Sequence, residues 1–273
     1  MYLRFLNALA ATLFVGGIAQ ADPLAGSELR VCADPQNLPY SRDDGSGFEN
    51  RIVAAIAREL GMRMTLIWLP EERGYVRKTL NAGLCDVIAG VPERYDPVRT
   101  TAPYYRSSYV FVSRADAGEP YRSFDDARLT TRKIGVQLIG DDLAATPPAH
   151  ALAARGIDVV GYTLYGEGRQ VERMIADLAK GTIDVALAWG PQAGYFAARA
   201  PLPLTLSIAE APPDLAQIPF VYSIAMGVRR NDADLQHALD AALQRARSAI
   251  DRILAEFAVP RIDRASPQAE LAP

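Results

Sequence analysis

The sequence predicts an α/β protein of two lobes, joined by two crossing strands that act as a hinge. Short apolar runs alternate with segments of helical spacing, which favours a mostly parallel sheet flanked by helices. This plan occurs twice along the chain. Two long β-rich runs, residues 108–113 and 219–228, are separated by about the length of one small domain. We therefore expect the chain to leave a first lobe, build a second one and return.

The first set of elements begins with an apolar strand at residues 29–34 and continues through a polar loop into an amphipathic helix. The apolar positions of this helix have helical spacing: Ile52, Val53, Ile56 and Leu60. Gly61 is placed to end the helix, and the alternating apolar side chains of residues 62–68 predict a second strand. Residues 86–89 predict a parallel neighbour of the first strand.

The second set begins near Ser123. Residues 134–136 and 159–162 predict strands, with a helix at residues 141–154 between them. Residues 171–178 predict another helix that Gly181 ends, and residues 185–189 predict the next strand. The final helix, residue 232 to about 257, has Asn231 or Asp232 as its N-cap and returns to the first lobe.

These elements set the expected lobe limits. The first lobe comprises residues 29–112 and 218–260, and the second comprises residues 113–217. Residues 261–273 have little apolar content and predict a mobile tail. Pockets often lie between lobes, so we expect a ligand cleft there.

The N-terminus predicts export to the periplasm. Arg4 is the one basic residue of a short leader, residues 6–18 are apolar, and Ala19-Gln20-Ala21 is a small-residue cleavage site, as in a secretory signal peptide (residues 1–21). The apolar run is shorter than the roughly 18 residues that span a bilayer; an uncleaved anchor is the alternative. The mature chain has 28 basic and 32 acidic side chains, a net charge of −4, which argues against nucleic acid or anionic lipid as the partner.

The chain has two cysteines, Cys32 and Cys85, and an even pair in an oxidising compartment predicts a disulfide. Cys32 lies on the first strand and Cys85 just before its expected neighbour. Strands about 4.8 Å apart bring the two backbones close enough for a bridge. Two buried thiols are the alternative.

The order of several short motifs resembles the periplasmic solute-binding proteins of family 3, over most of residues 29–260. These motifs are residues 29–34, Gly47-Phe48-Glu49, Gly83-Leu84-Cys85-Asp86, Pro92-Glu93-Arg94, Pro103-Tyr104-Tyr105 and Ile134-Gly135-Val136-Gln137. The segments CADPQNLPYS, GFENRI and TTAPYYRSSYVFV are similar to the quinoprotein-dehydrogenase-associated subgroup, the MoxJ and XoxJ type proteins of methanol oxidation systems. The resemblance implies a type II periplasmic binding protein fold.

The resemblance also implies a site. Arg94 matches the family's arginine that grips a ligand carboxylate, a contact that suits a bidentate guanidinium. The family's acidic residue that holds an α-ammonium should follow residues 185–188, but this chain has Trp189-Gly190-Pro191. Asp34, Asn37 and Tyr40 also follow the carboxyl end of a strand, where open α/β sheets bind ligands. The expected cleft is lined by Asp34, Asn37, Tyr40, Phe48, Glu49, Arg94, Tyr104, Tyr105, Gln137 and Trp189.

Because a free amino acid would lose its main counter-charge, we expect a non-catalytic accessory protein. Its expected partner is a pyrroloquinoline-quinone (PQQ)-dependent alcohol dehydrogenase of the periplasm, with a small polar ligand as a further option. One alternative is the substrate-binding component of an ABC transporter for a polar amino acid or small carboxylate. Another is a cyclohexadienyl-type dehydratase, in which Glu49, Glu93 or Asp86 would serve as the acid.

Each site residue also has a purely structural interpretation. Asp34 and Asn37 can cap a turn beside prolines, and Glu49 can favour the start of a helix through the helix dipole. Tyr104 and Tyr105 can pack between strands or lobes. Arg94 can be a solvated loop arginine.

We expect no catalytic machinery, metal or cofactor. The only histidines, His150 and His237, are far apart in the sequence, which gives little support to a metal cluster or a Ser-His-Asp arrangement. Residues 43–47 lack the acidic residue at calcium-loop spacing. Gly166-Glu167-Gly168 is too short for a glycine-rich nucleotide motif.

Overall fold

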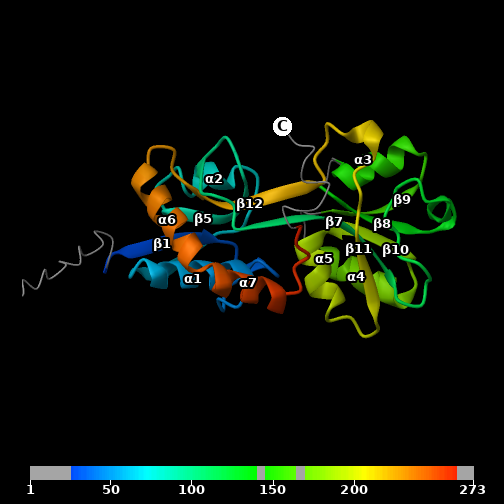
Figure 1. Cartoon of the computed structure of the whole chain (residues 1–273), viewed down its shortest axis with the longest axis horizontal. Helices are drawn as coiled ribbons and strands as arrows, with labels where there is room; N and C mark the ends of the chain where they lie inside the picture. The colour runs from blue at the N-terminus through cyan, green and yellow to red at the C-terminus, as the bar shows by residue number, and fades with distance from the viewer. Residues whose placement is uncertain (1–25, 140–144, 164–169, 263–273) are drawn as a thin grey trace, which may run out of the picture.

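The computed structural model describes residues 26–139, 145–163 and 170–262. The expected signal peptide, the 166–168 motif and residues 263–273 lie outside these ranges. The fold has two lobes along the long axis of the molecule, with long strands running between them (Figure 1). It is the two-lobed α/β architecture that the sequence predicts.

Lobe 1 is built around parallel strands. β1 (Glu28–Ala33) pairs with β4 (Arg63–Trp68) on one side and with β5 (Val87–Pro92) on the other. The helices α1 (Phe48–Glu59), α6 (Ala233–Arg245) and α7 (Arg247–Glu256) complete its main layer. One apolar core joins buried side chains of β1 and α1 to those of α6 and α7, which come from the end of the chain.

Lobe 2 repeats the parallel arrangement. β8 (Ile134–Leu138) pairs with β9 (Val159–Thr163) and with β10 (Val185–Trp189). Its helices are α3 (Pro147–Ala154), α4 (Gln170–Lys180) and α5 (Gly190–Ala197). β11 (Leu204–Ile208) pairs antiparallel with β7. Two apolar clusters, one on each face of the sheet, form the core of this lobe.

The strands β7 (Tyr105–Arg114) and β12 (Val221–Val228) connect the lobes. They pair antiparallel with each other, while β12 also pairs with β5 in lobe 1 and β7 with β10 in lobe 2. The main strand order is therefore β4-β1-β5-β12-β7-β10-β8-β9. These are the two crossing strands expected from the sequence, each longer than or close to its predicted run.

The remaining elements are short. They are β2 (Gln36–Asn37), β3 (Ser41–Arg42), α2 (Tyr75–Lys78) and β6 (Arg99–Thr100), with 3-10 turns at Ala127–Thr131 and Pro213–Leu215. β2 and β3 form a small hairpin after β1. Gly61 and Gly181 have φ angles of 65° and 76°, the left-handed conformation that ends a helix and suits glycine.

Two helices differ from the sequence prediction. Residues 141–144 of the helix expected at residues 141–154 lie outside the described ranges, and α3 begins at Pro147 with Thr146 as N-cap, because proline is favoured in the first helical turn. The long final helix is divided into α6 and α7 at Ala246, whose ψ angle of 0° departs from helical geometry. Asp232 is the N-cap of α6: its side chain accepts a hydrogen bond from the amide of Leu235.

The predicted disulfide is confirmed. Cys32 and Cys85 are bonded, with their Cα atoms 5.5 Å apart. Cys32 lies on β1, and β5 begins two residues after Cys85. Both side chains are buried in a small apolar cluster. The bridge therefore attaches the loop before β5 to the first strand.

The described residues that follow α7 pack on the protein, including the first two residues of the tail predicted at 261–273. We call residues 257–262 the C-terminal strap. Ile262 is 8% exposed and its amide donates a hydrogen bond to the carbonyl of Arg106. Arg261 forms an ion pair of 2.6 Å with Asp251. Among the described residues, no helix is both long and apolar enough to cross a membrane.

Candidate functional site

A small polar cavity lies where β1, β4 and β5 meet the start of α1. Its volume is about 30 Å³. Its polar lining comes from the loops after β1 and β4, the β2-β3 hairpin, α1 and α2: Asp34, Asn37, Ser41, Glu49, Asn50, Glu71 and Tyr75. This is the carboxyl-end position at which open α/β sheets bind ligands. The space equals about one water molecule, far below the several hundred Å³ of ordinary ligand pockets.

Both carboxylate oxygens of Asp34 accept hydrogen bonds from backbone amides. Its Oδ1 accepts a hydrogen bond from the amide of Gln36 at 2.8 Å, as in an Asx turn. Its Oδ2 accepts one from the amide of Glu71 at 2.7 Å. Asp34 thus fixes the loop after β4 to the loop after β1, in agreement with the structural interpretation of this residue.

Asn37 and Glu71 form the rim of the cavity. The Asn37 Nδ2 donates a hydrogen bond of 3.0 Å to Glu71 Oε2. The pKa of Glu71 is raised, first by desolvation of its carboxylate and second by the nearby negative charge of Asp34. Other parts of the Glu71 residue are exposed. Two carboxylates therefore lie close together at this edge.

The Glu49 side chain extends from the first turn of α1 toward the backbone of Gly90. A Cβ placed on Gly90 would lie 2.4 Å from Glu49 Oε1, and the φ of 76° at Gly90 independently favours glycine there. Oε1 is buried and has no hydrogen-bond partner in the described part of the chain. Desolvation and, second, the charge of Glu71 raise the pKa of Glu49 to about 8, despite a polar contact with Tyr104. Glu49 is therefore mostly protonated at neutral pH.

Four aromatic side chains pack against one another in this region: Tyr40, Phe48, Tyr104 and Tyr105. Phe48 is fully buried in the lobe 1 core, 5.3 Å from the Tyr40 ring and 6.0 Å from the Tyr105 ring between centroids. Tyr104 contacts Tyr105, and its hydroxyl accepts a hydrogen bond from the Gly90 amide at 3.1 Å. Burial raises the pKa of the Tyr40, Tyr104 and Tyr105 hydroxyls well above 10, so all three stay neutral.

Gln137 and Trp189 lie in lobe 2 and are coupled to each other. The Gln137 Oε1 accepts a hydrogen bond of 2.9 Å from the Trp189 amide, and its Nε2 donates one of 2.8 Å to Gln192. Gln137 is 3% exposed. The Trp189 ring packs edge-on against Tyr109 and Tyr222, with centroids 5.4 and 5.6 Å apart. The amide of Gln137 holds the start of α5 in place.

Arg94 lies apart from the small cavity. It follows β5 in an exposed turn with a φ of 61°, and its amide donates to Thr100 Oγ1 at 3.4 Å. It lines a different, open depression of about 480 Å³ with Arg99 and Arg230. The structure therefore does not bring Arg94 together with Asp34, Asn37 and Glu49.

Sequence reasoning missed residues that contribute to the cavity and to the aromatic contact between lobes: Ser41, Asn50, Glu71, Tyr75, Tyr109, Gln192 and Tyr222. Glu71 had a readable signal, since it follows the predicted strand at residues 62–68 at the same sheet edge as Asp34. Gln192 and Tyr222 had none, because their roles depend on contacts between distant segments.

The three carboxyl groups considered as acids differ sharply. Asp86 receives a 2.7 Å contact from Arg30 and a 3.0 Å contact from Arg229. Although desolvation acts in the opposite direction, these hydrogen bonds lower the pKa of Asp86, so it stays ionised. Glu93 is exposed. Only Glu49 combines burial with a proton to donate near neutral pH. No group of three or more His, Cys, Asp or Glu side chains in the described segments is arranged to hold a metal ion.

The fold and the site identify a class. The chain belongs to the bacterial extracellular solute-binding proteins, family 3, whose model matches residues 29–258.

Within this class the chain is similar to Protein MoxJ. It is 33% identical to MoxJ of Methylorubrum extorquens AM1, over 88% of this chain and 83% of the relative, and 32% identical to MoxJ of Paracoccus denitrificans, over 95% and 97%. The crystal structure of the periplasmic binding protein XoxJ from Methylobacterium extorquens AM1 matches with a TM-score of 0.72 and 34% identity, over 86% of this chain and 99% of XoxJ. The predicted family and subgroup are confirmed.

Proposed function

We propose that this chain is a periplasmic, non-catalytic accessory protein that binds a PQQ-dependent alcohol dehydrogenase of the methanol type. The observation that carries the proposal is similarity to MoxJ over most of both chains. The MoxJ and XoxJ type proteins that this sequence resembles are those of methanol oxidation systems. The solute-binding fold then serves as a scaffold for binding a protein.

The geometry of lobe 2 argues against an amino-acid receptor. Trp189-Gly190-Pro191 occupies the place where family members carry an acidic residue, and it forms the beginning of α5. The residue that directly follows residues 185–188 is Trp189, whose indole ring carries no negative charge, and a Cβ on the next residue, Gly190, would lie 2.6 Å from the Ser108 carbonyl oxygen. The family's acidic position therefore supplies no counter-charge for an ammonium group.

The polar cavity of lobe 1 cannot hold a whole solute by itself. About 30 Å³ accommodates a water molecule and not an amino acid. Asp34 and Asn37 are already engaged by Gln36 and Glu71. The ligand-contact roles of the predicted cleft residues, and the lobe limits given above, remain predictions.

The test is binding to purified PQQ-dependent alcohol dehydrogenase from the same cells, measured by biolayer interferometry with the mature chain immobilised. We expect saturable binding, and co-purification after crosslinking in cells grown on an alcohol. Absence of binding in both experiments would overturn the proposal. A solute screen by thermal unfolding runs in parallel, since a true ligand at about 100 times its Kd adds roughly 2.7 kcal/mol of stability.

A dehydratase is the second candidate, because Glu49 is a buried, protonated carboxyl group with an unpartnered oxygen. Turnover of a prephenate-type ring acid by the protein alone, lost in Glu49→Gln, would establish it.

A further inference from the structure

We propose that a groove on lobe 1, between α1, α7 and β4, binds an acidic segment of a partner protein. This inference rests on the proposed function, in that the chain acts by binding another protein. The groove has a volume of about 660 Å³, more than twenty times that of the polar cavity. The two share no lining residue.

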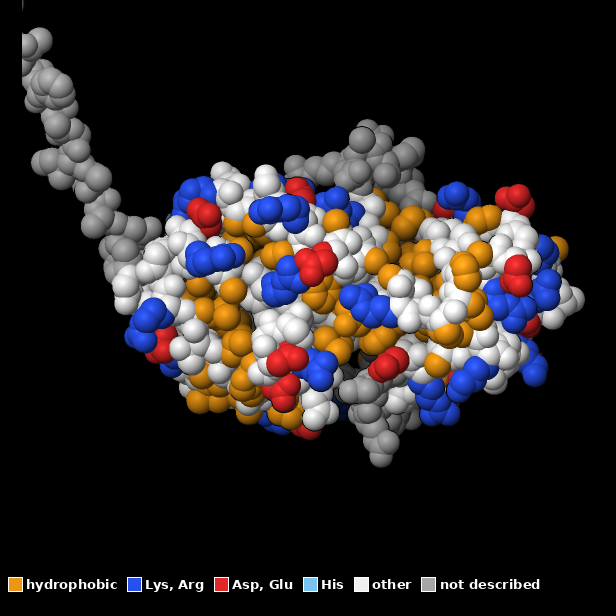
Figure 2. Space-filling model, turned by 90° about the horizontal axis from the view of Figure 1, so that it is seen from below, with side chains coloured by type: hydrophobic (Ala, Val, Ile, Leu, Met, Phe, Trp, Pro, Cys, Tyr) orange, Lys and Arg blue, Asp and Glu red, His pale blue; other side chains and the backbone are white. Residues whose placement is uncertain are grey.

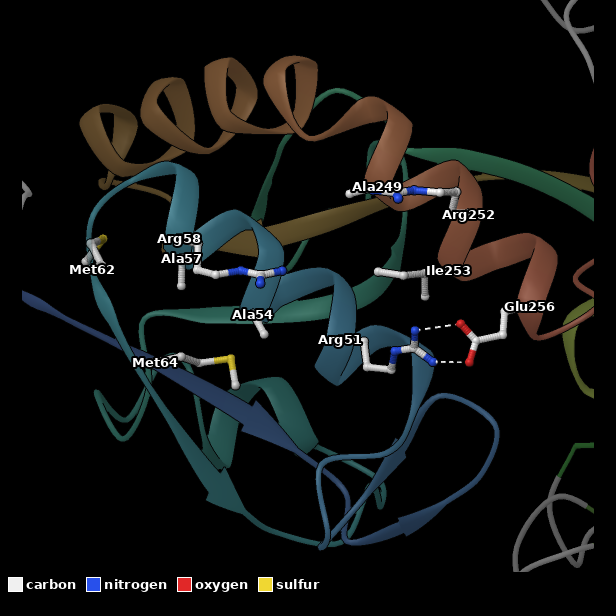
Figure 3. Close-up of a pocket in the computed structure, with 10 residues that line it drawn as sticks. All are labelled: Arg51, Ala54, Ala57, Arg58, Met62, Met64, Ala249, Arg252, Ile253 and Glu256. Atoms are coloured by element: carbon white, nitrogen blue, oxygen red, sulfur yellow. Dashed lines mark hydrogen bonds and ion pairs between the residues drawn. The ribbon is translucent and has the colours of Figure 1, made fainter.

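The floor of the groove is apolar and made of small or adaptable side chains. Two helices line it, α1 with Ala54 and Ala57 and α7 with Ala249 and Ile253, and Met62 and Met64 close it beside β4 (Figure 3). Methionine fits irregular partners because its side chain is unbranched and polarizable. Figure 2 shows apolar side chains gathered on this half of the molecule, with both basic and acidic side chains around them.

Three arginines line the groove, and two of them lack a carboxylate partner in the described segments. Arg51 is paired with Glu256 through contacts of 2.5 and 2.6 Å, which close one end. The Arg252 side chain contacts only the Ser248 carbonyl, through Nε, and the exposed Arg58 side chain has no hydrogen-bond or ion-pair partner among the described residues. In Figure 3, Arg58 extends from α1 and Arg252 from α7, toward one another across the groove.

This charge arrangement selects an anionic occupant. The Arg58 and Arg252 guanidinium groups have no carboxylate partner among the described residues, so a carboxylate of an occupant can form charge-assisted hydrogen bonds with them. The lining residues carry three arginines and one glutamate, whereas the whole chain has a net charge of −3. The lining of the groove is therefore more positive than the chain as a whole.

The spacing of the lining residues favours a polypeptide segment. On α1, Arg51, Ala54 and Arg58 lie at helical positions i, i+3 and i+7, and α7 repeats this pattern with Ala249, Arg252 and Glu256. The alanines are small and the arginines long, so the groove runs between α1 and α7 with an apolar floor and charged edges. Such a groove suits a segment with apolar anchors and acidic flanks. A single small anion would contact the arginines and leave the apolar floor exposed.

The experiment compares three variants of the mature chain. Arg58→Glu with Arg252→Glu reverses the groove charge, and Ala54→Phe fills the groove without changing charge. Arg122→Glu with Arg132→Glu is the control, since both arginines are exposed on lobe 2 and the net charge change is the same. The probes are the purified dehydrogenase and a fluorescein-labelled helical peptide of glutamate, leucine and alanine. Circular dichroism verifies folding, and Ala54→Phe keeps the test valid if the charge reversal unfolds the chain.

We expect both groove variants to weaken binding of the dehydrogenase and of the peptide by about tenfold or more, while the control changes it by about twofold or less. Equal dehydrogenase binding by all variants would overturn the groove and leave the proposed function intact. Peptide binding that depends on the groove, with no dehydrogenase binding by the unmodified chain, would support the groove and overturn the proposed function. Groove-dependent binding to phosphatidylglycerol vesicles but not to the peptide would also overturn this inference.

Discussion

The pKa of Glu49 reflects both the burial of its carboxyl group and the charge of a neighbouring residue. Its carboxyl group is enclosed by the close approach of Gly90 and by Tyr104, and one oxygen is left without a partner among the described residues. A charged carboxylate in such surroundings is costly, so the group keeps its proton instead. The nearby charge of Glu71 acts in the same direction.

This protonation has a consequence for stability. The pKa of Glu49 is raised from 4.5 to about 8 in the folded protein, so between these pH values the folded state holds a proton that the unfolded state has released. The free energy of unfolding should therefore fall as the pH rises through this window. Glu49→Gln should be about as stable as the unmodified chain at pH 4 and about 1–3 kcal/mol more stable above pH 8.

Urea unfolding at several pH values measures the difference. Glu93→Gln is the matched control, because Glu93 is exposed and its replacement should leave the pH dependence unchanged. A pH profile of Glu49→Gln that is parallel to that of the unmodified chain would contradict the buried, protonated state.

Gln137 supplies a second test at the residue scale. Because its side chain holds the Trp189 amide and Gln192 inside the protein, Gln137→Ala leaves buried polar groups unpaired. We expect a loss of about 1–3 kcal/mol in the free energy of unfolding. Gln217→Ala, exposed on the same lobe, is the control. An unchanged stability for Gln137→Ala would favour a ligand-contact role over the structural one.

At the scale of elements, the Cys32–Cys85 bridge closes a long covalent loop of the chain in lobe 1. The two cysteines are 53 residues apart, and the segment between them contains α1, β4 and α2. Replacing both by alanine should destabilise the protein by about 4 kcal/mol through the added freedom of the unfolded chain. Thermal unfolding measures the loss, and reduction of the unmodified protein should reproduce it. Equal melting temperatures with and without reductant would show that the bridge contributes nothing.

The sequence predicted elements whose signals are local. Apolar periodicity located α1 and α4, and the glycines at 61 and 181 located helix ends, because both signals depend on neighbouring residues alone. The division of the last helix at Ala246 was missed, since alanine favours helix and the break depends on how α6 and α7 each pack against lobe 1. The edge strands β6 and β11 were missed because antiparallel pairing with a distant strand leaves no fixed local pattern.

The candidate site follows the same division. The sequence predicted Asp34, Asn37 and Glu49 near one sheet edge because that edge follows from strand order, and all three line the lobe 1 cavity. It could not show that the backbone of Gln36 and of Glu71 engages both Asp34 oxygens, or that Arg94 lies in another depression. Those facts depend on loop conformations, which the family motif alone does not determine.

At the scale of the whole molecule, the C-terminal strap is a third connection between the lobes. It leaves α7 in lobe 1 and reaches β7 and α5 (Figure 1). The Phe257 ring stacks on Tyr195 of α5 at 5.5 Å, and the Pro260 carbonyl accepts a hydrogen bond of 2.6 Å from Ser107. Two crossing strands alone permit a hinge motion. A third contact on α5 opposes that motion, which suits a scaffold for a protein partner better than a solute trap.

Gly194→Val tests the strap. A Cβ at residue 194 would lie 2.0 Å from the Ala258 carbonyl, so the valine must displace the strap from α5. We expect a loss of about 1–3 kcal/mol from overpacking, together with a broader distance distribution between spin labels on the two lobes. Ala198→Val, at an exposed position just after α5, should change neither quantity. A destabilised Gly194→Val protein whose distances remain as narrow as those of the unmodified chain would show that β7 and β12 fix the lobes without the strap.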